Sequence, residues 1–563
     1  MKLLLLFPLN EPFDTVVNAG KMPWKMKLSA QKTIKKIDCV YPTGLLSIGA
    51  YVRKFLPDAE IRILDCNVVM NQLADVQGTH ISEMARETFF EACAAAVRDF
   101  VPELIGFSAL FCSNYQDLEP FVRFWKQRFP EALLIGGGHL PAAIYKQMFE
   151  DGTALEAISF GEGEIPVLKL CRAMEQGAAA EYLARSESWI TAEKLKQNSG
   201  FQPQRELLED LDEIPPFDFS MLVFPDVYFN SSRYFFVIET SEDCREMFLF
   251  STRGCPHHCV FCASQNVHGH RVRYYSTERI KSDILFYHRK FGVNRFVFYD
   301  DHFLVRKRRA IEILDFVASL GLRAEIPTPA FFAIDDEVAA AMYRAGIREV
   351  NITIESGNPD TLRNIMHKPA NLEQAEKAVA ILHRHGILPI SNILIGVPGE
   401  TAESIETGIR YLMTTEINWF QCFVTAPLPG SELYEICREN GYLACDDLFA
   451  MDFKKCVIRT PDFEPEFIEH KVYEMNLRLN FLNNYDYRIG NYRGALRLFE
   501  RILLTVLDTH AFACYFAAKC CRKLGEAEKY ERYRKRYLKL IELYPFWKEW
   551  AEELFLPPLE ELA

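Results

Sequence analysis

Three cysteines lie within eight residues of one another and are the part of the sequence best suited to chemistry. Cys255, Cys259 and Cys262 have the spacing C-x3-C-x2-C and directly follow a predicted strand. Thiolates suit a cubane iron–sulfur cluster, because iron is held by soft, anionic sulfur. Three ligands for four irons leave one iron open to a chelating substrate, as a catalytic zinc keeps an open position. The alternative is a structural zinc site with His257 or His258 as fourth ligand.

The segment around these cysteines resembles the motif of the radical S-adenosylmethionine (SAM) superfamily, C-x3-C-x-aromatic-C, with Phe261 in the aromatic position. The resemblance continues through the whole 246–430 region. It implies a [4Fe–4S] cluster on the three cysteines, with SAM chelating the open iron and yielding a 5′-deoxyadenosyl radical on one-electron reduction. No side chain is assigned as catalytic, because the cofactors carry the hard chemistry and the protein supplies orientation and dryness.

Turns after other predicted strands match the same superfamily by position. Asp300 lies after the second barrel strand, where the family often has Gly-Gly-Glu. The segment 355–357 resembles the part that contacts the ribose and carboxylate of SAM, and the turns with Gly396 and Pro427 resemble the adenine-side motifs. Each segment is also compatible with an ordinary barrel turn. The resemblance implies SAM contacts at Phe261, Asp300, Glu355, Ser356, Gly357, Gly396 and Pro427.

The N-terminal part of the chain carries a second set of glycines and polar residues at predicted strand ends. They occur at 41–46, 106–109, 136–139 and 161–164. Glycines at strand ends let the backbone approach a flat, bulky ligand. The segments resemble the cobalamin-binding domain found ahead of many radical SAM barrels. The resemblance implies cobalamin contacts at Gly44, Ser108, Gly136, Gly137, His139, Gly161, Glu162 and Gly163.

One departure concerns the loop after the first strand. Cobalamin domains of the methionine synthase type carry Asp-x-His-x-x-Gly there, whereas residues 8–12 of this chain read PLNEP, without a histidine. The radical SAM branch commonly lacks this histidine too, which implies a cobalt without a lower histidine ligand. The departure also fits a domain that has kept its fold and lost the cofactor, because a fold alone does not establish function.

Two series of alternating strands and helices position these residues. In the first, five apolar runs predict a doubly wound parallel, Rossmann-like sheet, with the ligand beyond the carboxyl ends of the strands. These strands are Lys2–Phe7, Ile61–Asp65, Leu104–Ala109, Ala132–Ile135 and Leu155–Phe160. In the second, six β/α units predict a partial (β/α)6 barrel. Its strands are Met247–Ser251, Arg295–Tyr299, Arg323–Pro327, Glu349–Ile354, Pro389–Ile395 and Trp419–Ala426.

The pattern divides this α/β chain into four parts. We predict a Rossmann-like cobalamin-binding domain at 1–180, a linker at 181–245, a radical SAM partial barrel at 246–455 and an all-α C-terminal domain at 456–563. In the last part, similar segments begin at Gly490 and Gly525, and their spacing resembles a tetratricopeptide unit. An ordinary helical cap on the barrel fits equally well.

Composition narrows the function classes. The chain has 64 Lys and Arg against 77 Asp and Glu, a net charge of −13, which disfavours broad binding to nucleic acid. The N-terminal apolar run is broken at Pro8 and no small-residue cleavage site follows, so a first strand is favoured over a secretory signal. No run of about 18 apolar residues suggests a membrane span. We therefore expect a cytoplasmic protein.

The expected activity is reductive cleavage of SAM, followed by methyl transfer through cobalamin to an unactivated carbon or phosphorus of a small molecule or peptide. An electron donor such as flavodoxin or ferredoxin is implied, and the C-terminal helices offer a surface for a protein partner. Two alternatives stay open. One is a non-methylating radical cyclisation, rearrangement or oxidation, and the other is a cobalamin or redox sensor or scaffold with a partner-binding helical tail.

Overall fold

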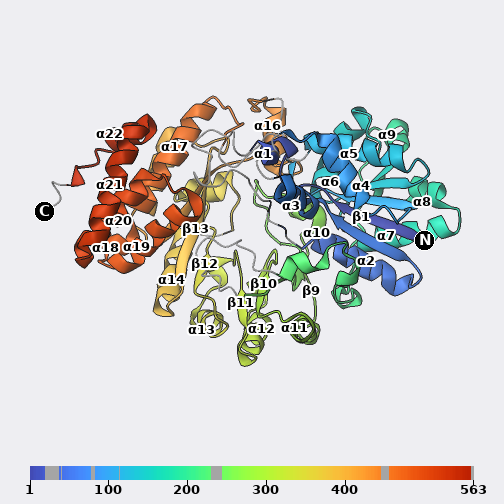
Figure 1. Ribbon diagram of the computed structural model, residues 1–563, viewed down its shortest axis with the longest axis horizontal. Helices are drawn as coiled ribbons and strands as arrows, with labels where there is room; N and C mark the ends of the chain where they lie inside the picture. The colour runs from blue at the N-terminus through green and yellow to red at the C-terminus, as the bar shows by residue number, and fades with distance from the viewer. Residues whose placement is uncertain are drawn as a thin grey trace.

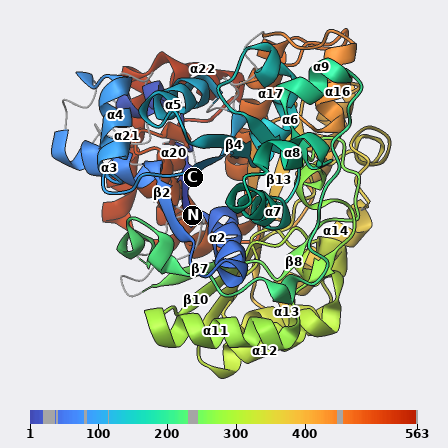
Figure 2. The ribbon, with the colours of Figure 1, turned by 90° about the vertical axis from the view of Figure 1, so that its right-hand side faces the viewer.

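The computed structural model describes residues 1–18, 37, 39, 41–77, 83–112, 115–229, 244–369, 371–445 and 455–559. In chain order these residues form a six-stranded sheet with helices, an arc of six β/α units, and a group of helices (Figure 1). Figure 2 looks from the side of the first sheet, which lies in front of the other two parts. Among the described helices, none is both long and apolar enough to cross a membrane.

The first part is one sheet whose leading five strands are parallel, as the sequence predicts. The strands are β1 (Lys2–Phe7), β2 (Glu60–Asp65), β3 (Leu104–Ser108), β4 (Leu133–Gly137), β5 (Ala157–Ser159) and β6 (Trp189–Ile190). Their order is β2-β1-β3-β4-β5-β6. The short β6 adds an antiparallel edge that was not predicted, because two residues carry no detectable periodicity.

Helices cover both faces of this sheet because its interior strand β1 is apolar on both sides. Leu3 and Leu5 of β1 belong to one core cluster with α2 and α7, whereas Leu4 and Leu6 belong to another with α5 and α6. The helices are α1 (Phe13–Val17), α2 (Thr43–Phe55), α3 (Cys66–Gln77), α4 (Arg86–Ala95), α5 (Tyr115–Arg128), α6 (His139–Glu150), α7 (Glu164–Glu175), α8 (Ala179–Arg185) and α9 (Ala192–Gln197).

The segment after α9 returns to the edge of the first sheet. It contains the short turns η5 (Leu211–Glu213), η6 (Phe219–Met221) and η7 (Pro225–Phe229). Leu222 forms an isolated parallel bridge with Ile63 of β2. This path holds the start of the second part close to the first sheet. The domain boundaries given above stay a prediction.

The second part has the six predicted parallel strands in two three-stranded sheets. One sheet, in the order β11-β10-β7, contains β7 (Glu246–Leu249), β10 (Arg295–Phe298) and β11 (Arg323–Glu325). The other, in the order β12-β13-β14, contains β12 (Glu349–Asn351), β13 (Leu388–Ile395) and β14 (Trp419–Val424). Their carboxyl ends therefore share one edge of the arc, where chemistry is expected in such units.

Helices connect these strands and one more follows the last strand, and local signals in the sequence set the ends of several of them. They are α11 (Thr277–Phe291), α12 (Lys307–Ser319), α13 (Asp336–Arg344), α14 (Leu372–Arg384), α15 (Ala402–Leu412) and α16 (Glu432–Glu439). Ser276 caps α11 at its start and Gly292 ends it in the left-handed region. Asn371 and Thr401 form capping boxes at the starts of α14 and α15.

A small hairpin interrupts the series after β7. Its strands are β8 (Thr252–Arg253) and β9 (Arg273–Tyr274), which pair antiparallel, and its loop contains α10 (Gln265–His268). Shorter turns follow later strands: η8 (Phe303–Val305), η9 (Phe331–Ala333) and η10 (Thr361–Ile365). We call residues 254–272 the cysteine hairpin, because it contains all three clustered cysteines.

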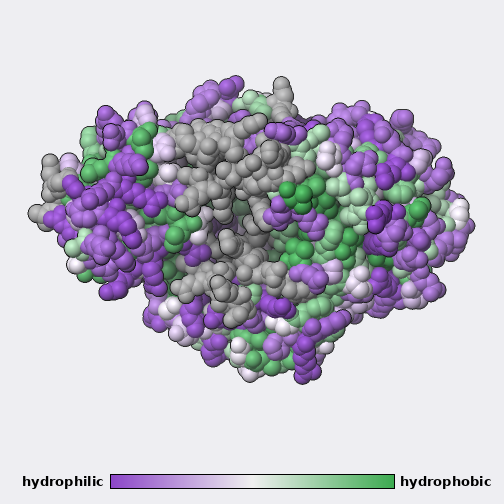
Figure 3. All heavy atoms as spheres, in the orientation of Figure 1, coloured by the Kyte–Doolittle hydropathy of each residue, from purple (hydrophilic) through white to green (hydrophobic). Residues whose placement is uncertain are grey.

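The third part is helical, as predicted. Its elements are α17 (Pro465–Leu477), η12 (Arg478–Leu482), α18 (Tyr485–Arg488), α19 (Tyr492–Arg501), η13 (Ile502–Val506), α20 (Ala511–Leu524), α21 (Ala527–Leu543) and α22 (Pro545–Glu553). Helix α17 packs on β14, while α20 packs against both α19 and α21. Hydrophilic side chains dominate this part of the surface in Figure 3. The tetratricopeptide resemblance stays a prediction.

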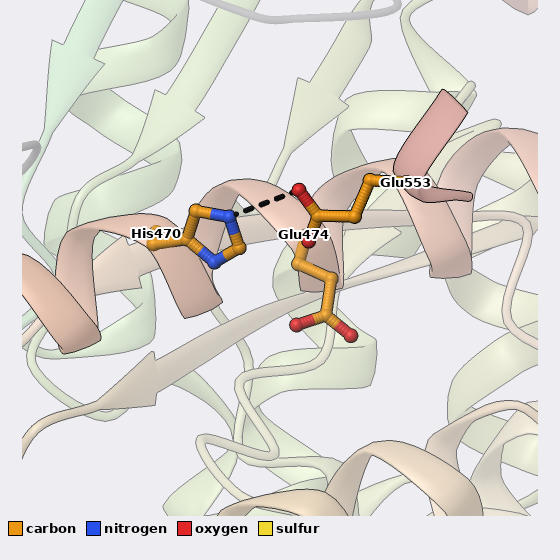
Figure 4. A group of neighbouring side chains, drawn as sticks. All are labelled: His470, Glu474 and Glu553. Carbon is orange, nitrogen blue, oxygen red and sulfur yellow. Dashed lines mark hydrogen bonds and ion pairs between the residues drawn. The ribbon is translucent and has the colours of Figure 1, made fainter. Parts of the chain in front are cut away.

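A surface contact joins the last helix to α17. His470 Nε2 lies 3.2 Å from Glu553 Oε2, and the His470 ring stacks on Trp550 at 4.7 Å between centroids. Glu474 lies beside them (Figure 4), but its carboxylate is already paired with Lys471 and Arg478. The two cations neutralise this acid, so we interpret the group as a helix-to-helix contact.

Candidate metal and cofactor site

The cysteine hairpin brings Cys255, Cys259 and Cys262 into one half-buried loop. The amide of Cys262 donates to the carbonyl of Cys259 at 3.0 Å, and the amide of Cys255 donates to Gly269 O at 3.4 Å. Burial raises the pKa of all three thiols, that of Cys259 to about 11. A bound metal would reverse this, because coordination deprotonates a thiol. The three sulfurs form the donor set that an iron–sulfur cluster requires.

The hairpin closes through a backbone contact that only glycine permits. Gly254 has a φ of +93° and directly precedes Cys255. A Cβ on Gly254 would lie 2.5 Å from the carbonyl oxygen of Arg271, on the opposite side of the hairpin. A side chain would therefore force the two sides apart and shift the first cysteine.

Two acids after β10 hold this hairpin in place. Asp301 accepts hydrogen bonds from the Gly254 amide at 2.9 Å and from the Ser264 hydroxyl at 2.6 Å, and so joins both sides of the cysteine run. Asp300 accepts from the amides of Ser251 and Thr252 at 2.5 and 3.0 Å. Burial raises the pKa of Asp300 to about 6, against the effect of these hydrogen bonds. Its predicted SAM contact stays a prediction, since these bonds already use the carboxylate.

Glu355 pairs with a lysine that the sequence did not single out. The Lys368 ammonium lies 3.0 Å from Glu355 Oε1, and the two side chains are only 11% and 8% exposed. Glu355 has a φ of +75°, a strained conformation that clusters at ligand sites. The charge of Lys368 opposes the effect of burial on the pKa of each clustered cysteine. Two residues before Lys368, the Met366 carbonyl accepts from the Val260 amide of the cysteine hairpin at 3.1 Å, so Lys368 lies near the cysteines.

The other predicted SAM residues lie at the same carboxyl edge, beyond β12, β13 and β14. A Cβ on Gly357 would lie 2.2 Å from the Gly408 carbonyl, so α15 packs directly on this turn. Gly396 has a φ of +91°, and its amide donates to the buried Glu400 at 2.8 Å. Pro427 is buried in the turn after β14. Two further residues complete the predicted set: Ser356, which is buried, and Phe261, which packs against the barrel core.

The cysteine hairpin also contacts the turns after the fourth and sixth barrel strands. The amide of Val260 donates to Met366 O at 3.1 Å, and the carbonyl of Val260 accepts from the Leu433 amide at 2.9 Å. The Asn266 side chain donates to Gly430 O. The structure therefore brings the cysteines together with the predicted SAM turns.

A cavity of about 290 Å³ lies between the first sheet and the cysteine hairpin. Leu249, Arg253 and His268 line it from the barrel side. A Cβ on Gly44 or on Gly137 would meet no heavy atom within 4 Å, so these glycines face open space. The predicted cobalamin residues that line the cavity are Gly44, Ser108, Gly136, Gly137, Gly161, Glu162 and Gly163.

His139 is the member of that predicted set that does not line the cavity. It begins α6, where burial lowers its pKa and its ring faces the backbone of Pro429. Gly138 before it has a φ of +86°, and a Cβ there would lie 2.6 Å from Ala109 O. This tight turn directs His139 toward the loop after β14. Its cobalamin contact stays a prediction.

Buried ion pairs between the first sheet and the hairpin were not predicted. Arg253 Nη1 lies 3.2 Å from Glu162 Oε2, and Arg253 Nη2 lies 2.8 Å from Glu164 Oε1. Arg273 contacts both oxygens of Glu162, at 2.5 and 2.9 Å. His268 Nδ1 lies 2.8 Å from Glu162 Oε1. Single arginines at strand ends give no sequence signal for partners about 100 residues away.

Two histidines also meet beside the cysteines. His257 Nε2 and His302 Nε2 are 3.3 Å apart, so one ring donates a hydrogen bond to the other. Phe332 packs edge-on against His257, with centroids 5.6 Å apart. Burial lowers the pKa of both histidines, which favours neutral rings, and the ring that accepts this bond has to be neutral.

Comparison with known proteins agrees with this arrangement. A family model described as the radical SAM superfamily matches residues 249–412, and one described as the B12 binding domain matches residues 38–170. An uncharacterized methyltransferase of Pyrococcus horikoshii is 31% identical over 43% of this chain. The match covers half of that relative's own length. The cytidylyl-2-hydroxyethylphosphonate methyltransferase of Streptomyces wedmorensis is 23% identical over 75% of this chain and 83% of its own.

Solved structures share the fold over almost the whole chain. The radical SAM methyltransferase TsrM from Kitasatospora setae has a TM-score of 0.55 at 15% identity, covering 94% of this chain and 99% of its own. The cobalamin-dependent SAM radical enzyme OxsB has a TM-score of 0.58 at 12% identity, covering 98% and 80%. The two family models match consecutive parts of the chain, and the two solved structures share the fold over both of these parts. The chain therefore belongs to the cobalamin-binding radical SAM family.

Proposed function

We propose that this chain is a cobalamin-dependent radical SAM methyltransferase that acts on an unactivated carbon or phosphorus. The observation that carries the proposal is that the two sites share a wall. Arg253, at the base of the cysteine hairpin, and His268, within it, line the same cavity as the strand-end glycines of the first sheet. When bound, the cluster and SAM supply a 5′-deoxyadenosyl radical, and cobalamin supplies a carrier for the methyl group. The protein would hold both groups on either side of this shared wall.

Cys255, Cys259 and Cys262 would hold the cluster. Asp301 and Gly254 fix the hairpin that presents the three sulfurs. Three protein ligands would leave one iron open for SAM. The neighbouring His257 is engaged with His302, so it is not required as a ligand.

The SAM site is formed by Glu355 and Lys368. Their carboxylate and ammonium complement the ammonium and carboxylate of the methionine end of SAM, and both are withdrawn from water. Ser356 and Gly357 continue this wall. Gly396 and Pro427 lie at the ends of the next two strands, where we assign the adenine side.

The cobalamin site is the cavity between the sheet and the hairpin. Its open glycines, Gly44 and Gly137, leave room for a flat group at the carboxyl ends of the strands. Ser108 offers a hydroxyl to the polar rim of the corrin. The residues therefore fit the cofactor, and no histidine in the described part of the cavity other than His268 reaches its wall.

The substrate is a small molecule or peptide that enters between the two cofactors, and an electron donor such as flavodoxin or ferredoxin reduces the cluster. We also propose a cytoplasmic location and a protein contact through the C-terminal helices.

The test uses the anaerobically reconstituted full chain with methyl-labelled SAM, a reductant and cobalamin. We expect the label to appear on cobalamin and 5′-deoxyadenosine to form, and both to disappear in the Cys255/Cys259/Cys262→Ala variant. 5′-Deoxyadenosine without labelled cobalamin would identify a non-methylating radical enzyme and overturn the methyl-transfer proposal. Neither product, in protein with a full complement of iron and cobalt, would favour a sensor or scaffold.

A further inference from the structure

Two arginines face each other across the neck of the cysteine hairpin. Arg253 of β8 and Arg273 of β9 are directly opposed Cα partners. Their side chains are 10% and 3% exposed. Like charges at opposed positions of a sheet repel, and burial removes the water that would screen them. The neck is therefore unstable unless an anion lies between the two guanidinium groups.

That anion is Glu162, which comes from the first sheet and not from the barrel. Its side chain is 2% exposed, and its two oxygens contact both Arg253 and Arg273 at 2.5 to 3.2 Å. Glu164, 4% exposed, is a second anion in contact with Arg253, at 2.8 Å from its Nη2. Ser47 adds a hydroxyl, which donates to Glu164 and accepts from Arg253. Two carboxylates thus balance two guanidinium groups.

The ionised form of Glu162 follows from these contacts. Burial alone would raise its pKa, but the charge of Arg253 and the hydrogen bonds from Arg273 and His268 bring the pKa well below the usual range. Glu162 is therefore an anion near neutral pH.

The bridge also connects the two cofactor sites. Gly161 and Gly163, on either side of Glu162, line the cavity assigned to cobalamin. On the other side, Arg253 is followed directly by Gly254 and Cys255. A displacement of the cavity wall would thus reach the first cluster ligand through one buried ion pair and two peptide bonds.

We propose that Glu162 is a positioning residue that closes the neck of the cysteine hairpin from the cobalamin side, and so couples the order of the cluster ligands to the occupancy of the cobalamin cavity. The closure of the neck follows from the described contacts alone. The coupling to cobalamin rests on the proposed function. Because coupling between two sites is reciprocal, a loaded cluster should also tighten cobalamin binding.

The first experiment measures hydrogen exchange in the full chain without cofactors. In Glu162→Gln, which keeps the shape and removes the charge, we expect the neck amides of residues 252–255 and 273–275 to exchange about a hundredfold faster. The control is Glu312→Gln, which removes an acid half-exposed on α12 and paired with Lys281. Exchange in β1 and β3 reports whether each variant keeps its fold.

A double variant separates repulsion from simple loss of packing. Glu162→Gln/Arg273→Gln removes one of the two opposed charges, so we expect neck exchange to return most of the way toward the wild-type rate. Neck exchange within twofold of wild type in Glu162→Gln would overturn the proposal. A double variant no slower than the single variant would also overturn it, because repulsion would then not be the cause.

The second experiment tests the coupling. Hydroxocobalamin is titrated into wild type and Glu162→Gln, each with and without reconstituted iron, and the spectrum of the reduced cluster is recorded with and without hydroxocobalamin. We expect iron to tighten cobalamin binding, and cobalamin to shift the cluster spectrum, in wild type only. Equal responses in Glu162→Gln would overturn the coupling. Wild type that binds neither iron nor hydroxocobalamin would instead refute the proposed function, while the exchange result would stand.

Discussion

Replacing Gly254 by alanine tests the geometry of the cysteine hairpin most sharply. Gly254 has a φ of +93°, and the added Cβ would lie 2.5 Å from Arg271 O and 3.2 Å from Gly269 O. Side chains in such a conformation cost roughly 1–3 kcal/mol. Overpacking against a backbone that cannot retract costs about 1–3 kcal/mol more. The closed hairpin is therefore destabilised by about 2–6 kcal/mol, enough to leave it open in most molecules.

A matched control separates strain from collision. Gly321, at the end of α12, has a φ of +70°, but a Cβ there would meet nothing within 4 Å. Gly321→Ala therefore carries only the conformational cost. We expect Gly254→Ala to lose most of its iron on anaerobic reconstitution, while Gly321→Ala loads iron as wild type does. Wild-type iron content in Gly254→Ala would refute the argument that the close approach to Arg271 holds the first cysteine in place.

Three further perturbations address the other parts of the site. Gly137→Leu should fill the open space of the cavity and weaken cobalamin binding by at least about tenfold, or ~1.4 kcal/mol, with iron content unchanged, as cobalt and iron analysis would show. Lys368→Met should weaken SAM binding in a direct titration by about 1.5–3 kcal/mol, because it removes a buried charged donor. Burial raises the pKa of Glu349 to about 8. Between about pH 4.5 and 8 the native state therefore binds one more proton here than the unfolded state, and the free energy of unfolding should fall as the pH rises through this range. Denaturant titrations should show that Glu349→Gln reduces this fall, and an unchanged slope would contradict the assignment.

Elements with long periodic patterns were predictable from the sequence. β1 has the predicted bounds, and β13 ends at Ile395, as predicted. Five parallel strands followed by six β/α units also gave the two carboxyl edges that carry the sites. These strands and helices form because they bury apolar faces, and the periodic spacing of apolar residues in the sequence shows which faces these are.

Contacts between the two α/β parts were not predictable in the same way. β8 and β9 have two residues each, too few for a pattern, yet their pairing forms the neck of the cysteine hairpin. The sequence predicts Glu162 as a cofactor contact, and the structure shows that it also forms ion pairs with Arg253 and Arg273. Nothing in the sequence marks Lys368 as a site residue, whereas the structure places its ammonium 3.0 Å from Glu355 Oε1. Such pairs depend on three-dimensional distance, for which a single sequence holds no signal.

The central claim is that one chain holds an iron–sulfur cluster on three cysteines and a cobalamin in the adjoining cavity. Its most direct test is the iron, sulfide and cobalt content of anaerobically reconstituted wild type beside the Cys255/Cys259/Cys262→Ala variant. The account predicts four irons and one cobalt per wild-type chain, with the iron lost and the cobalt kept in the variant. Iron without cobalt would contradict the cobalamin half of the account, and wild type without iron would contradict the whole of it.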